Sequence, residues 1–202
     1  MDLDAIKSAL EAREFFLVYQ PILFLRDGLC FGAEALIRWR RGNVVLAASE
    51  FIPLSDRTPL SGVLTYWVME TVAAELGDWL DSNGAAHISV NVPPEILGRG
   101  GLEYAATKSG LRARAKQLIL EVTERGIPDQ LGLDALNSIP GTGAQVALDD
   151  TTLSARIWRC SHAAASTSSR SISCSSLSLL PTSRQRAGWR GLRRCCEQHR
   201  CK

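Results

Sequence analysis

Apolar and polar positions follow two periods along residues 1–150, and each period predicts one kind of element. Apolar residues recur at helical spacing most clearly over Gly62–Leu80, which predicts a long helix with one buried face. Similar but shorter patterns predict further helices over Asp4–Glu14, from Ser49-Glu50, over Leu102–Gly110 and over Asp129–Ile139. Runs rich in β-branched and bulky apolar residues predict strands over Phe15–Leu25, Phe31–Trp39, His87–Val92, Gln117–Thr123 and Ala144–Leu148.

The order of these elements predicts the fold class. Strands alternate with helices, which favours right-handed βαβ units and a parallel sheet or barrel. The run over Gln117–Thr123 is continuously apolar, as expected of a parallel strand covered on both faces. Gln20-Pro21 is expected to interrupt the first strand, and Arg40–Asn43 to form a turn after the second. We therefore expect an α/β protein.

Acid or amide side chains lie at or near the ends of the predicted strands, where barrel enzymes place their sites. Five of them offer the oxygen donors that Mg²⁺ and Mn²⁺ prefer: Glu34, Asn91, Glu121, Asp149 and Asp150. Any single acid at a strand end is more often solvated or a helix cap, and Asp149-Asp150 could serve as such a cap. The set as a whole indicates a cation site.

These residues stand in blocks whose order and spacing resemble the EAL family of cyclic di-GMP phosphodiesterases. The blocks are Tyr19–Ile22, Gly32–Trp39, Phe51–Leu54, Ser89–Asn91, Leu120–Glu124 and Ala147–Asp150. The resemblance covers about the first 150 residues. It implies a TIM-like (β/α) barrel with an antiparallel first strand.

The resemblance also implies a metal-dependent hydrolase that cleaves cyclic di-GMP to the linear dinucleotide. Two Mg²⁺ or Mn²⁺ ions, held by the five oxygen ligands, would lower the pKa of a shared water and neutralise phosphoryl charge. By the same match, Gln20 and Arg38 would contact the dinucleotide, Arg38 through a phosphate, and Glu124 would hold an active-site loop. On the residues alone, Arg38 could equally be surface charge, and Gln20 could serve only a turn before Pro21.

Composition divides the chain into two segments. Residues 1–150 hold 13 basic and 20 acidic side chains, a balance of −7, whereas residues 151–202 hold 10 and 1, a balance of +9. Five of the six cysteines fall in the second segment. We expect 1–150 to be the N-terminal part of an EAL barrel, with about five strands retained. We expect 151–202 to be a disordered or irregular Ser/Arg/Cys-rich tail.

The sequence departs from the family after Asp150. The family continues with a Phe-Gly-Thr-Gly type loop and a strand bearing Lys-Ile-Asp, and neither follows here. With plausible codons, Ser166–Ile172 reads in another frame as Leu-Asp-Val-Ile-Lys-Ile-Asp, so we hypothesise a frameshift from about Thr151–Arg156 onward. Without the family's later lysine, glutamate and glutamine, activity would be impaired. The alternatives are a degenerate module that binds cyclic di-GMP or a protein without catalysis, and a non-functional fragment.

Location and other partners are predicted from what the sequence lacks. Cys30 alone cannot build a disulfide framework, and no export signal or membrane-length apolar run follows the acidic start. We therefore expect a cytoplasmic protein without a membrane partner. The tail's Cys195, Cys196, His199 and Cys201 lack zinc-site spacing, and its arginines predict no specific nucleic-acid binding. A homodimer remains open.

Overall fold

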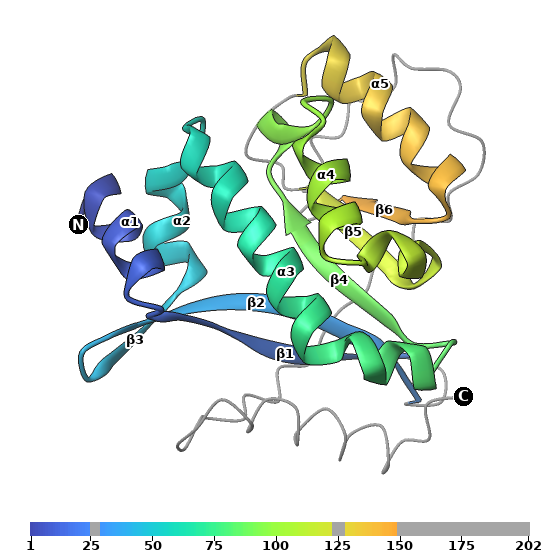
Figure 1. The fold of residues 1–202 in the computed structure, drawn as a ribbon, viewed down its shortest axis with the longest axis horizontal. Helices are drawn as coiled ribbons and strands as arrows, with labels where there is room; N and C mark the ends of the chain where they lie inside the picture. The colour runs from blue at the N-terminus through green and yellow to red at the C-terminus, as the bar shows by residue number, and fades with distance from the viewer. Residues whose placement is uncertain (25–28, 123–127, 149–202) are drawn as a thin grey trace.

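The computed structural model describes residues 1–24, 29–122 and 128–148, which form one sheet and the helices that cover it (Figure 1). The strands are β1 (Phe15–Leu23), β2 (Cys30–Arg41), β3 (Val44–Ala47), β4 (His87–Val92), β5 (Leu118–Val122) and β6 (Gln145–Leu148). The α-helices are α1 (Leu3–Glu11), α2 (Ala48–Ser55), α3 (Pro59–Ser82), α4 (Gly101–Lys108) and α5 (Gln130–Ser138). Short 3₁₀ helices are η1 (Pro94–Ile96), η2 (Leu111–Gln117) and η3 (Ile139–Thr142).

The sheet has the order β1-β2-β4-β5-β6, with β3 added to β2. β1 runs antiparallel to β2, whereas β2, β4, β5 and β6 pair in parallel. This is the strand order of an opened (β/α) barrel with an antiparallel first strand. The predicted α/β class and the five main strands are therefore confirmed.

The helices pack on one face of the sheet and build the core with it. Figure 1 shows α3 lying across the sheet, and α3 contacts β1, β2 and β4. One side of each of these strands alternates into this layer, where apolar residues of β1, β2 and β4 pack against the apolar stripe of α3. Leu76 of that stripe is fully buried, and burying such a side chain contributes about 1.5–3 kcal/mol.

An aromatic cluster joins β1 to β2 and to helix α2. The rings of Phe15, Trp39 and Phe51 lie with centroids 5.3–5.7 Å apart. The Trp39 indole N–H also donates to Glu14 Oε2 at 2.8 Å, so this buried ring keeps a polar contact.

Helix α3 begins three residues earlier than the hydrophobic stripe predicted, at Pro59 instead of Gly62. Thr58 is its N-cap, because its Oγ1 accepts the backbone N–H of Leu60 at 3.2 Å. Pro59 suits the first turn, where a missing N–H is not needed. The helix ends at Ser82, two residues beyond the predicted end at Leu80.

Of two local predictions on β1 and β2, the first was wrong and the second misplaced one end of a turn. Pro21 does not interrupt β1 but pairs with Ala33 of β2. β1 lies at the edge of the described sheet, and an edge strand tolerates proline because backbone N–H groups on its outer side have no partner strand to bond. The turn expected at Arg40–Asn43 is shorter, since β2 runs to Arg41 and β3 pairs back on it from Val44. The four-residue β3 was too short to be predicted.

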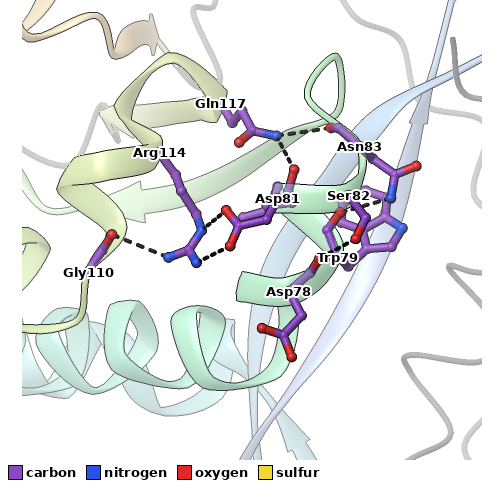
Figure 2. Close-up of polar contacts among 9 residues, drawn as sticks. Asp78, Trp79, Asp81, Ser82, Asn83, Gly110, Arg114 and Gln117 are labelled. Carbon is purple, nitrogen blue, oxygen red and sulfur yellow. Dashed lines mark hydrogen bonds and ion pairs between the residues drawn. The ribbon is translucent and has the colours of Figure 1, made fainter.

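Polar contacts at the end of α3 connect it to the start of β5. The buried Gln117 amide donates from Nε2 to the carbonyl oxygens of Leu80, Asn83 and Ala86 at 3.0, 3.0 and 3.1 Å. Figure 2 shows Arg114 beside it, holding Asp81 through two hydrogen bonds of 2.7 and 2.6 Å. The loop between α3 and β4 is thereby fixed against β5.

Candidate active site

The predicted site residues that the structure describes lie on the face of the sheet opposite the helices. In β2, β4 and β5 the core residues alternate with the remaining positions, so Ala35, Val90 and Leu120 face the helices. The alternate positions on the other face belong to Glu34, Asn91 and Glu121. Gln20 and Arg38 share this face by the same alternation in β1 and β2.

Strand register brings four of these residues onto neighbouring strands. Gln20 pairs with Glu34 across β1 and β2, and Asn91 pairs with Glu121 across β4 and β5. Ser89 of β4 pairs with Glu34 across β2 and β4. The polar face is therefore continuous from β1 to β5.

Hydrogen bonds run diagonally across this register. Asn91 Nδ2 donates to Glu34 Oε1 at 2.8 Å, and Ser89 Oγ donates to Glu121 Oε1 in a short contact. The central strand β4 thus provides a donor for the carboxylate on each neighbouring strand. Such charge-assisted bonds are stronger than bonds between neutral groups.

Arg38 lies further along the polar face of β2. Its Nη1 donates to the carbonyl oxygen of Ile37 at 2.9 Å. Burial lowers the pKa of the guanidinium, while the attraction of Glu34 opposes that shift. An arginine remains charged under either influence, so Arg38 adds a positive charge to the carboxylates of this face.

The predicted ligands were expected at or near the ends of their strands, and this holds for Asn91 and Glu121 but not for Glu34. Asn91 and Glu121 each stand next to last in their strands, β4 and β5. Glu34 was expected near the end of its strand but is the fifth of twelve residues, because β2 continues past its parallel neighbour to pair with β3. Glu124, Asp149 and Asp150 lie outside the described residues.

The donor set fits a hard divalent cation. Glu34, Asn91 and Glu121 offer carboxylate and amide oxygens, the ligands that Mg²⁺ and Mn²⁺ prefer. The Asn91 amide uses an N–H towards Glu34, so its carbonyl oxygen remains a ligand of the right type. Within 1–24, 29–122 and 128–148, no group of three His, Cys, Asp or Glu side chains is close enough to hold a metal ion.

Two polar contacts near the site have no signal in the sequence. One is the bond from Ser89 to Glu121. The other is a bond of 2.7 Å from the Tyr19 hydroxyl to Glu75 Oε2 of α3, on the helix side of the strand that carries Gln20. Burial raises the pKa of both groups of this second pair, although the bond from Tyr19 lowers that of Glu75. Sequence gave no signal, since the paired residues stand 32 and 56 positions apart.

Fold and polar face together define a (β/α)-barrel protein with a candidate cation site. The family model described as the EAL domain matches residues 3–156, and the chain belongs to that family. The residues that the structure describes therefore form part of a TIM-like barrel of the EAL type. No helix in the part of the chain that the structure describes has the length and apolar character to cross a bilayer.

Comparisons with individual proteins agree with the family assignment. The chain is 32% identical over 149 residues to the probable cyclic di-GMP phosphodiesterase PdeB of Escherichia coli, covering 72% of this chain and 29% of PdeB. It is 30% identical over 151 residues to the bifunctional diguanylate cyclase/cyclic di-GMP phosphodiesterase MucR of Pseudomonas aeruginosa, covering 72% and 22%. A solved structure of the MucR phosphodiesterase in complex with c-di-GMP superposes with a TM-score of 0.66 at 29% identity, covering 75% of this chain and 64% of that one. The chain thus spans less than a third of either curated relative.

Proposed function

We propose that this chain acts on cyclic di-GMP, hydrolysing it to the linear dinucleotide with the help of divalent cations. The observation that carries the proposal is the pair of hydrogen bonds across adjacent strands, in which Asn91 donates to Glu34 and Ser89 donates to Glu121. The names of PdeB and MucR, both described as cyclic di-GMP phosphodiesterases, support the choice of substrate.

The cations would be Mg²⁺ or Mn²⁺, held by Glu34, Asn91, Glu121, Asp149 and Asp150. When bound, they would supply an activated water and neutralise charge on the phosphoryl oxygens. Asn91 would also orient the Glu34 carboxylate through the bond between them.

Three further side chains would act on the substrate or its surroundings. The Arg38 guanidinium would bind a phosphate of the dinucleotide, since its planar donors match phosphate oxygens. Gln20, across the strand pair from Glu34, would contact the same ligand. Glu124 would hold an active-site loop.

We further propose that hydrolysis is slow. Residues 151–202 contain neither the Lys-Ile-Asp motif nor the later family acids and amides, and we propose that they form a tail, of which residues 157–202 lie beyond the EAL match. Losing a group that orients or deprotonates water typically costs about 10²–10⁴-fold in rate.

The nucleotide sequence across codons 148–175 tests the frameshift, because codons without the alternate reading would contradict it.

A hydrolysis assay with Mn²⁺ or Mg²⁺ tests the activity. Product formation by the full chain should exceed that of Glu34→Gln, which keeps the shape of the side chain and removes its charge. Equal rates for the two proteins would exclude hydrolysis at this site.

The departure after Asp150 favours a second candidate, a module that binds cyclic di-GMP or a protein without cleaving it. Calorimetric titration with cyclic di-GMP separates the two, because binding without turnover identifies the module. Absence of binding together with a non-cooperative thermal transition would indicate a non-functional fragment.

A cytoplasmic location and a homodimer stay predictions, and sedimentation equilibrium measures the latter.

A further inference from the structure

Ser89 is a buried hydroxyl on the polar face of β4, between two predicted ligands. Its side chain has 0% exposure. Its Oγ donates to Glu121 Oε1, and the carbonyl oxygen of Ile119 lies farther away at 3.5 Å. Because a serine hydroxyl has one hydrogen, the short contact to the carboxylate is the bond that it makes.

The register of the three strands explains why Ser89 reaches Glu121. Ser89 pairs with Ile119 across β4 and β5, and Glu121 stands two residues further along the same face. Asn91 reaches Glu34 by the matching diagonal towards β2, in the opposite direction along the strands. Each carboxylate is thus held by one side chain of the strand between them.

A held carboxylate binds a cation more readily than a mobile one. A glutamate side chain has three rotatable bonds, and ordering them costs conformational entropy. When the folded protein already holds the side chain in place, cation binding does not have to meet that cost. Hydrogen-bond donors behind metal ligands act in this way, and their loss typically lowers metal affinity about 10–100-fold.

We propose that Ser89 is a positioning residue for the cation site, where its hydroxyl holds the Glu121 carboxylate in the orientation that binds a divalent cation. This inference rests on the proposed metal-dependent function. It goes beyond that function in assigning a role to a residue that is not itself a ligand.

Binding of Mn²⁺ to the full 202-residue chain, followed by the electron paramagnetic resonance signal of the free ion, tests the role without measuring catalysis. Ser89→Ala should bind Mn²⁺ about 10-fold more weakly than wild type. Ser55→Ala is the matched control, since Ser55 is equally buried but donates to the carbonyl oxygen of Ile52 at 2.7 Å. That control should bind Mn²⁺ with the affinity of wild type.

A double variant shows whether Ser89 acts through Glu121. In a Glu121→Ala background, Ser89→Ala should cause no further loss of Mn²⁺ affinity, because the acceptor is already gone. A loss as large as in the wild-type background would overturn the inference. Wild-type affinity in Ser89→Ala would overturn it as well, while leaving the proposed function intact.

Two further outcomes remain decisive. A wild-type chain that does not bind Mn²⁺ would overturn the metal-dependent function and this inference together. If circular dichroism shows that Ser89→Ala does not fold, Ser89→Cys replaces it, because a thiol of similar size is a weaker donor. Ser89→Cys should also bind Mn²⁺ more weakly than wild type, and unchanged affinity would refute the positioning role.

Discussion

The buried Gln117 amide offers a quantitative test of how the helical layer is joined to the sheet. We consider Gln117→Met, which keeps the length of the side chain and removes its two N–H donors. In the native protein these donors serve three carbonyl oxygens, those of Leu80, Asn83 and Ala86. The substitution leaves the acceptors without the amide and keeps the packing volume nearly constant.

The expected magnitude follows from the number of donors lost and from what the acceptors retain. Leaving a buried polar group unsatisfied costs about 1–3 kcal/mol. The carbonyl oxygens of Leu80 and Asn83 keep backbone donors, from Asn83 at 3.1 Å and from Ala86 at 2.8 Å. We therefore expect Gln117→Met to lower the free energy of unfolding by about 2–3 kcal/mol, below the full penalty for three orphaned acceptors.

Urea unfolding followed by far-UV circular dichroism measures this change. Asp81→Asn is the matched control, because it weakens the neighbouring Arg114 pair, whose carboxylate is exposed to solvent. Its effect should be smaller than that of Gln117→Met and should shrink with added salt, as expected of an exposed ion pair. A Gln117→Met protein as stable as wild type, or less affected than Asp81→Asn, would refute the reasoning.

Three further substitutions test the fold at other points. Burial raises the pKa of Glu75 above its ordinary 4.5, so folding favours the protonated form of this side chain. The stability that this preference contributes is lost as the pH rises above about 4.5. The stability of Glu75→Gln relative to wild type should therefore grow as the pH rises above that value, and a pH-independent difference in thermal melts would contradict this. A Cβ on Gly32 would stand 2.0 Å from the carbonyl oxygen of His87, so Gly32→Ala should cost about 1–3 kcal/mol in chemical unfolding. Gly84→Ala, where nothing lies within 4 Å of the added carbon, should change stability by less than about 0.5 kcal/mol, and equal losses at both glycines would count against a steric cause.

Sequence pattern predicted the elements whose boundaries carry strong local signals. The strand expected over His87–Val92 coincides with β4, because the C-cap of α3 at Asn83 precedes it and Pro93 follows it. Helix α5 begins just after Asp129, whose side chain accepts the backbone N–H of Gly132 as a helix N-cap does. In these places the local residues decide the structure.

Other features depend on tertiary pairing and could not be predicted locally. Pro21 is a strand breaker by propensity. It nevertheless lies within β1, because β1 pairs with β2 on one side and has no partner strand on its other side in the described sheet. The contact between Tyr19 and Glu75 joins a strand to a helix 56 residues later, and only the packed layers bring them together. The same holds for Gln117, whose acceptors become neighbours only when α3 has docked on the sheet.

The candidate site itself shows why strands are suited to such a role. Alternation along β4 sends Ile88, Val90 and Val92 into the core and turns Ser89 and Asn91 to the polar face. Any one-residue slip of β4 would bury the polar side chains under the helices, so the core that stabilises the strand also fixes the register of the donors. The spacing of the carboxylates on β2 and β5 is thereby set by hydrophobic packing on the opposite face, which connects stability of the sheet to the geometry available for binding a cation.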